Sequence, residues 1–185
     1  MRKALNALYQ ASTILAACCL VGIATLVVLQ VGGRLIDGGR SLIGLEPLGL
    51  LVPSLAEIAG FMLVGASFLA LAGTLRRGDH IRVSILIQAV PAKVGRFLDV
   101  WALLVGFCLA TYFAWHAGLL AYDSYVYDEV SFGIIPIPLV YPQAVMTFGI
   151  GVLAIAFLDD LVTMLSGDAP SFEAGHADDI VEGTE

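Results

Sequence analysis

Basic residues are missing from the second half of this chain, since none of its nine lysines and arginines lies beyond Arg96. The formal net charge is −7. A basic surface is the electrostatic requirement for binding nucleic acid. We therefore expect no nucleic-acid partner.

Cysteine and histidine are also scarce, with three of each. Two of the cysteines are adjacent and the third is far away, which does not match the ligand spacing of a zinc site. No two histidines share an apolar run, so the paired axial ligands of a membrane cytochrome are absent. A phosphate-binding glycine loop, a G-x-S-x-G elbow and an HExxH motif are absent too. The sequence predicts no cofactor, no metal and no enzymatic activity.

What the chain has in abundance is apolar sequence. It is 59% hydrophobic and 14% charged, whereas soluble domains are about 45–50% apolar and about 25% charged. Four apolar runs are each long enough for the roughly 20 residues that cross a hydrocarbon core. They cover about residues 10–31, 57–75, 97–120 and 142–162. We therefore predict an all-α integral membrane protein, with a four-helix membrane domain over 1–167 and an acidic disordered tail over 168–185.

The first run also resembles two processing signals. Leu15-Ala16-Ala17-Cys18 matches a lipoprotein cleavage box. However, the apolar run continues well past Cys18, and no A-x-A-like site follows Val31. These features favour an uncut membrane helix over a cleaved or lipidated one.

The distribution of basic residues predicts the topology. Two precede the first run, two lie between the first and second, and five lie between the second and third, namely Arg76, Arg77, Arg82, Lys93 and Arg96. Membrane proteins keep their basic loops in the cytoplasm. We therefore expect both termini to be cytoplasmic in a bacterial inner membrane. Asp159 then lies near the inner face, where it is placed to pair with the basic connection.

The basic connection contains a second pattern. Val83, Leu86, Ile87 and Val90 recur at helical spacing up to Pro91, which predicts an amphipathic helix over about 80–90. This helix is too short to span the bilayer and is expected to lie in the membrane interface. A buried strand is the alternative, but an isolated strand in lipid leaves its backbone groups unsatisfied.

Glu57 is the most informative acid, because ionisable groups in membrane segments are costly and often functional. Nineteen residues separate it from Arg76, about 28 Å along a helix. If Arg76 marks the inner interface, Glu57 lies at the outer one. We therefore expect an interfacial or intersubunit contact for Glu57, in preference to a proton-carrying role in mid-membrane.

A basic residue follows the first span, a glutamate opens the second, a Gly-Ala pair lies within it, and an R-x-G-x-H-I-x-V segment and then a proline follow it. In this order, these elements resemble a known family, the small membrane subunit (DctQ-like) of tripartite ATP-independent periplasmic (TRAP) transporters. Ser131 to Pro138 is similar to the family's S-x-x-x-x-P segment. In this chain the candidate structural or subunit-interface residues are Arg34, Glu57, Gly65, Ala66, Arg77, Gly78, His80 and Pro91. One departure is Ser54, where many members have tryptophan.

The resemblance implies a scaffold subunit. Its partners would be a large polytopic membrane subunit, which holds the substrate and ion sites, a periplasmic substrate-binding protein and membrane lipids. Uptake of an organic acid would be driven by an ion gradient. Arg77 and His80 would anchor the amphipathic helix at the cytoplasmic surface, and Arg34 with Glu57 would fix the outer end of the second span.

Two other functions remain open from the residues alone. One is a self-sufficient homo-oligomeric transporter or channel that uses Glu57 as its coupling acid. The other is a membrane anchor for a redox enzyme, which would need haem or quinone ligands.

Overall fold

The computed structural model describes residues 2–77 and 92–166. They form four α-helices: α1 (Arg2–Leu42), α2 (Leu55–Arg77), α4 (Ala92–Val126) and α5 (Val140–Leu165). All four are long and apolar enough to cross a membrane, so the prediction of four membrane-length helices is confirmed, and the described residues form no β-strand longer than an isolated bridge. The predicted amphipathic helix over 80–90 and the acidic tail over 168–185 lie outside the described residues.

The helices extend beyond the predicted apolar runs. The 41 residues of α1 and the 35 of α4 give lengths of about 61 and 52 Å. A hydrocarbon core is about 30 Å thick, so both helices tilt in it or project from it. Hydropathy marks only the part of a helix that suits lipid. It does not mark polar turns such as Arg34–Leu42, which continue the same helix.

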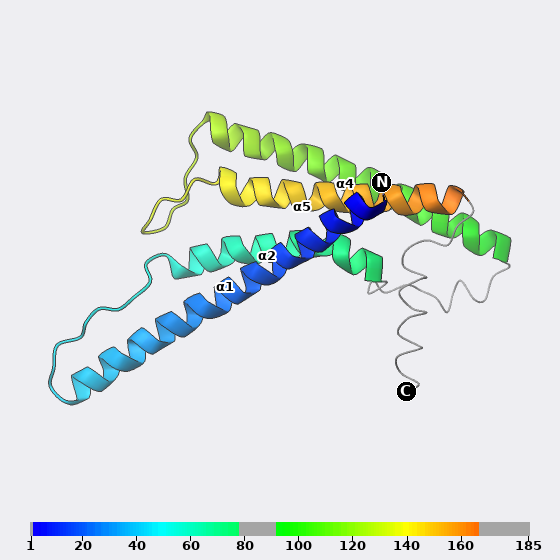
Figure 1. Cartoon of the computed structure of the whole chain (residues 1–185). Helices are drawn as coiled ribbons and strands as arrows, with labels where there is room; N and C mark the ends of the chain where they lie inside the picture. Colours follow the sequence, from blue (N-terminus) through cyan, green and yellow to red (C-terminus); the bar gives the residue numbers. More distant parts are fainter. Residues whose placement is uncertain (1, 78–91, 167–185) are drawn as a thin grey trace, which may run out of the picture.

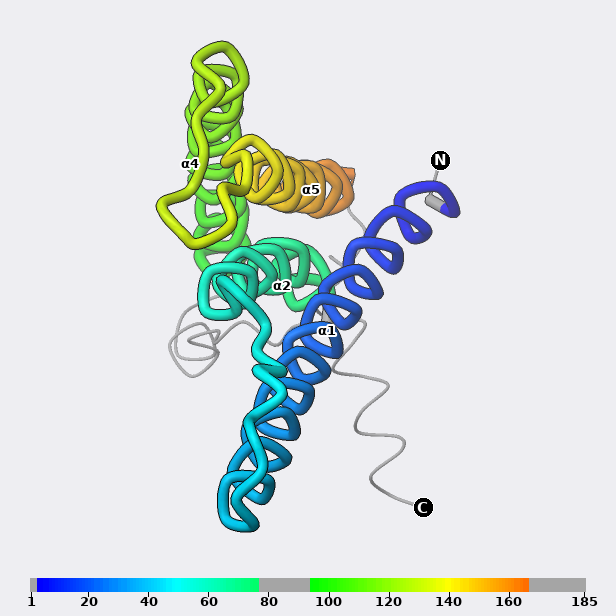
Figure 2. The backbone as a smooth tube through the Cα atoms, turned by 90° about the vertical axis from the view of Figure 1, so that its left-hand side faces the viewer, coloured from blue at the N-terminus to red at the C-terminus, as the bar shows by residue number. Residues whose placement is uncertain are grey.

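The helices form a bent row in the order α1, α2, α5, α4 (Figure 2). α2 packs between α1 and α5, while α4 packs on the other side of α5. One end of the row carries the start of α1 and the end of α5, and we call it the terminal end (Figure 1). The opposite end carries the connections 43–54 and 127–139, and we call it the loop end.

Small residues set the spacing between neighbouring helices. At Gly149 of α5, an added Cβ would lie 2.6 Å from the backbone carbonyl carbon and oxygen of Phe68 in α2. Buried alanines continue this contact at Ala72 of α2 and Ala156 of α5. Ala110, Ala117 and Ala154 do the same between α4 and α5. Such residues let helix backbones approach closely where lipid provides no hydrophobic drive for association.

A buried hydrogen bond joins α1 to α2. The Ser12 hydroxyl donates to the Leu69 carbonyl oxygen at 2.6 Å, and Ser12 is 1% exposed. Nearby, a Cβ at Gly73 would overlap the Thr13 hydroxyl. The two helices are therefore joined by a buried polar contact beside a tightly packed glycine.

The connection 43–54 returns along α1 and is held by side chains of that helix. Asp37 accepts hydrogen bonds from the backbone N–H groups of Leu48 and Gly49, at 2.7 and 3.1 Å. The Gln30 side chain accepts from Val52 N–H at 2.7 Å. These contacts satisfy backbone groups of a segment that has no regular secondary structure.

Candidate functional site

The head of α2 meets the connection between α4 and α5 at the loop end. Ser54 precedes α2 and Glu57 lies in its first turn, while Gly133 and Ile135 lie in the connection 127–139. We call these four residues the latch. The latch joins segments that are about 80 residues apart in the sequence.

Gly133 is the closest point of the latch. A Cβ at this position would overlap the Glu57 carboxylate, with Cδ at 2.7 Å, and would lie 2.8 Å from Ser54 Oγ. Glu57 Oε2 is shielded from solvent, and none of the described residues hydrogen-bonds to it. The carboxylate therefore occupies the space that only a glycine leaves open.

Ser54 holds the same connection by a hydrogen bond. Its Oγ accepts from the backbone N–H of Ile135 at 2.9 Å, and its carbonyl oxygen accepts from the N–H groups of Glu57 and Ile58 at 3.0 Å. Ser54 has a φ of 53°, a left-handed conformation that costs a residue with a side chain roughly 1–2 kcal/mol. Glu57 in the first turn interacts favourably with the positive end of the helix dipole. Ser54 is thus the last residue of the connection 43–54. It accepts the first hydrogen bonds of α2 and also binds the connection 127–139.

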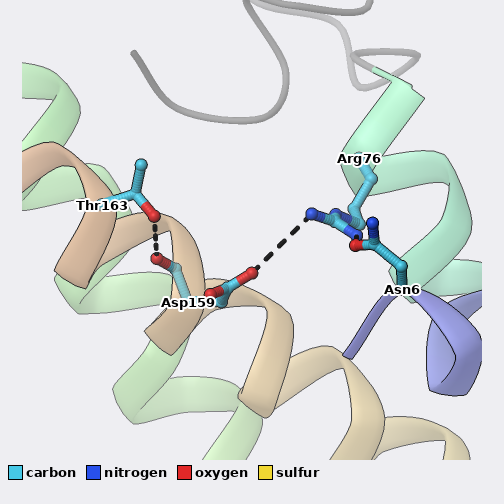
Figure 3. Close-up of polar contacts among 4 residues, drawn as sticks. All are labelled: Asn6, Arg76, Asp159 and Thr163. Carbon is cyan, nitrogen blue, oxygen red and sulfur yellow. Dashed lines mark hydrogen bonds and ion pairs between the residues drawn. The ribbon is translucent and has the colours of Figure 1, made fainter. Parts of the chain in front are cut away.

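A second polar cluster, which we call the clamp, lies at the terminal end (Figure 3). The Arg76 guanidinium in α2 lies 3.8 Å from the Asp159 carboxylate in α5 and donates a hydrogen bond to the Asn6 side chain in α1. It also stacks 4.6 Å from the centre of the Tyr9 ring. The expected pairing of Asp159 with the basic residues after the second span is confirmed for Arg76. The clamp ties three helices together at one level.

The structure places the remaining predicted residues as follows. Gly65 and Ala66 are buried in α2, and a Cβ at Gly65 would lie 3.3 Å from Cys19 Sγ of α1 and 3.4 Å from Val145 of α5. Arg34 is exposed on α1, and no ion pair joins it to Glu57 among the described residues. Arg77 is the last residue of α2. Gly78, His80 and Pro91 lie outside the described residues.

Sequence reasoning missed Gly133, Ser12 and the Asn6–Arg76 contact. Gly133 stands inside the Ser131–Pro138 segment that the resemblance singles out, so that segment was the available signal. Nothing in the sequence pairs Gly133 with Glu57 or Ser12 with Leu69, since both contacts depend on how the helices pack.

The contacts of the latch and the clamp pack and position elements of the chain. No group of three or more His, Cys, Asp or Glu residues that could hold a metal ion occurs in the described part of the chain. The described cysteines, Cys18, Cys19 and Cys108, are free thiols. Both the latch and the clamp are contacts between elements of this chain.

Comparison with known proteins identifies the family. The model of the family "Tripartite ATP-independent periplasmic transporters, DctQ component" matches residues 49–167. The match covers well over half of the chain and includes α2, α4, α5 and the whole latch. A search of curated proteins found no significant match. The chain therefore belongs to the DctQ family, the small membrane component of tripartite ATP-independent periplasmic transporters.

Proposed function

We propose that this chain scaffolds the large transport subunit of a TRAP-type secondary transporter and helps dock its periplasmic substrate-binding protein. The transporter would take up an organic acid at the expense of an ion gradient. The family match supports a role in such a transporter.

The shape of the helix row is the observation that carries this proposal. Because α2 and α5 form the middle of the row and α1 and α4 its edges, each helix keeps a surface that no other helix of this chain covers, and large apolar side chains are exposed on all four helices. Exposed residues on these surfaces include Val21, Val28, Leu63, Phe113, Phe148 and Val162. In a membrane, such surfaces contact lipid or another membrane subunit.

The charges support the same role. The central stretches of the four helices, 4–33, 58–75, 100–122 and 140–158, contain no Asp, Glu, Lys or Arg. Ion-coupled transport uses ionisable or polar ligands near mid-membrane. In a TRAP-type transporter we assign that chemistry to the large subunit.

The proposal includes an orientation in a bacterial inner membrane. Lys3 and Arg96 lie near the starts of α1 and α4, and Arg76 lies in the last turn of α2, and these helix ends are at the terminal end (Figure 1). Arg34 and Arg40 lie in the last part of α1, which is at the loop end (Figure 1). The positive-inside rule then puts the terminal end, with both termini, in the cytoplasm. The latch and both described connections would face the periplasm.

Purification from native membranes in mild detergent, with mass spectrometry of the co-eluting chains, tests this function. We expect a large polytopic subunit in equal amount with this chain. A chain that elutes only with itself, and that transports an organic acid when reconstituted alone, would contradict the scaffold role. Such a result would support the self-sufficient transporter instead.

A further inference from the structure

The connection between α4 and α5 is a folded element with an apolar tip. Residues 129–139 are closed at their base, where Leu139 N–H donates to the Glu129 carbonyl oxygen at 3.0 Å. Ser131 closes the next level, since its N–H donates to the Ile137 carbonyl oxygen at 2.9 Å and its Oγ accepts from Ile137 N–H at 3.0 Å. We call residues 129–139 the hook. The paired backbone gives the hook a defined conformation although it has no helix or long strand.

The latch fixes one side of the hook and leaves the other side open. Gly133 lies against Glu57, and Ile135 N–H is bound by Ser54. The side chains of Phe132 and Ile134, on either side of Gly133, are 105% and 84% exposed. Two large apolar side chains are thus presented by a backbone that is already held in place.

The hook lies near the ends of α4, α5 and α2, whereas the end of α1 with Arg34 and Arg40 lies at the far side of the row (Figure 2). The base of the hook carries Glu129 and, next to it, Asp128, both exposed. No Lys or Arg occurs from 97 onward. The surface is therefore an apolar tip with a negatively charged margin.

We propose that the hook is the surface with which this chain contacts the water-soluble binding protein, and that its partner surface is an apolar depression rimmed by Lys and Arg. The inference rests on the proposed function, which places the loop end in the periplasm. Charge complementarity selects the occupant, since acidic margins are matched by basic ones across protein interfaces. The same acids disfavour an anionic lipid surface.

The latch gives this contact a physical advantage. A flexible apolar loop loses conformational freedom when it binds, and that loss weakens affinity. Because Ser54 and Glu57 hold the hook before binding, most of that ordering is already complete. Aromatic side chains presented in this way are typical of the few residues that dominate interface affinity.

The test uses the complex of this chain with its large subunit in nanodiscs, titrated with the purified binding protein that belongs to the same transporter. We expect the double substitution Phe132→Ala and Ile134→Ala to raise the dissociation constant about tenfold. Both side chains project from the fold, so their removal leaves no cavity. The matched control is Ile43→Ala, a 72% exposed residue at the same end, which we expect to leave the constant unchanged.

Charge provides a second readout. Asp128→Lys should weaken binding and flatten its salt dependence, because wild-type affinity should fall as salt screens the acidic margin.

An unchanged dissociation constant in the double variant would overturn the proposal. Loss of the large subunit from the double variant would also overturn it and would assign the hook to that subunit. If the wild-type chain brings no large subunit, the proposed function itself fails, which is a separate result.

Discussion

At the scale of single residues, glycine has opposite roles at two neighbouring positions of α5. A Cβ at Gly149 would meet the backbone of Phe68, whereas a Cβ at Gly151 would have no neighbour within 4 Å. Overpacking against backbone typically costs about 1–3 kcal/mol, while Gly→Ala at an open helical site gains roughly 0.5–1 kcal/mol. The two positions therefore form a matched pair.

We expect Gly149→Ala to lower the free energy of unfolding by about 1–3 kcal/mol, because α2 and α5 must separate to accommodate the methyl group. Gly151→Ala should leave it unchanged or raise it slightly. Denaturant titration of both variants in the same detergent measures the difference. Equal stability of the two variants would mean that α5 does not approach α2 this closely.

At the scale of elements, Arg76 connects three helices through unlike contacts. It pairs with Asp159 in α5, donates to Asn6 and stacks on Tyr9 in α1. The side chains of Arg76 and Asp159 are 27% and 22% exposed, so solvent screens the pair only in part. The Tyr9 ring and the Asn6 amide add contacts that an isolated surface ion pair lacks.

We expect Arg76→Ala to destabilise the helix row by about 1–2 kcal/mol, with a coupling to Asp159→Ala of about 1 kcal/mol in a double-mutant cycle. Arg76→Lys should recover only part of the loss, because lysine lacks the planar group that stacks on the ring. Lys3→Ala, an exposed base at the same end, is the control. Additive effects of the two substitutions would show that the pair contributes nothing in solution.

The positions of the four helices could largely be predicted from the sequence, but which helices pack against each other could not. Four apolar runs without central charges are sufficient to predict four helices. The order of the helices in the row depends on single residues that leave no periodic pattern in the sequence. Examples are Ser12, whose hydroxyl donates to the Leu69 carbonyl oxygen, and Gly149, which lies against the backbone of Phe68. Likewise, Glu57 could be identified from the sequence as an acid at the start of a span. Its neighbour Gly133 could not, because nothing in the sequence indicates which of the 20 glycines lies opposite Glu57.

At the scale of the whole molecule, the two ends of the row should lie on opposite sides of the membrane. Ser41 lies near the end of α1 and Ser166 directly follows α5, and both are exposed. In a cysteine-free background, a membrane-impermeant thiol reagent applied to intact spheroplasts should label Ser41→Cys and should not label Ser166→Cys until the membrane is opened. The opposite pattern would reverse the orientation of the protein.

The order of the helices in space also has a consequence for biogenesis. α4 is synthesised before α5, yet in the folded protein it packs mainly against α5, at the edge of the row. When α4 leaves the ribosome, its packing partner has not yet been made, so it must wait in the lipid or at the insertion machinery. The assembly of this protein is therefore completed by its last helix, and an insertase that holds α4 until α5 arrives would have more influence on yield than one that assists α1 and α2.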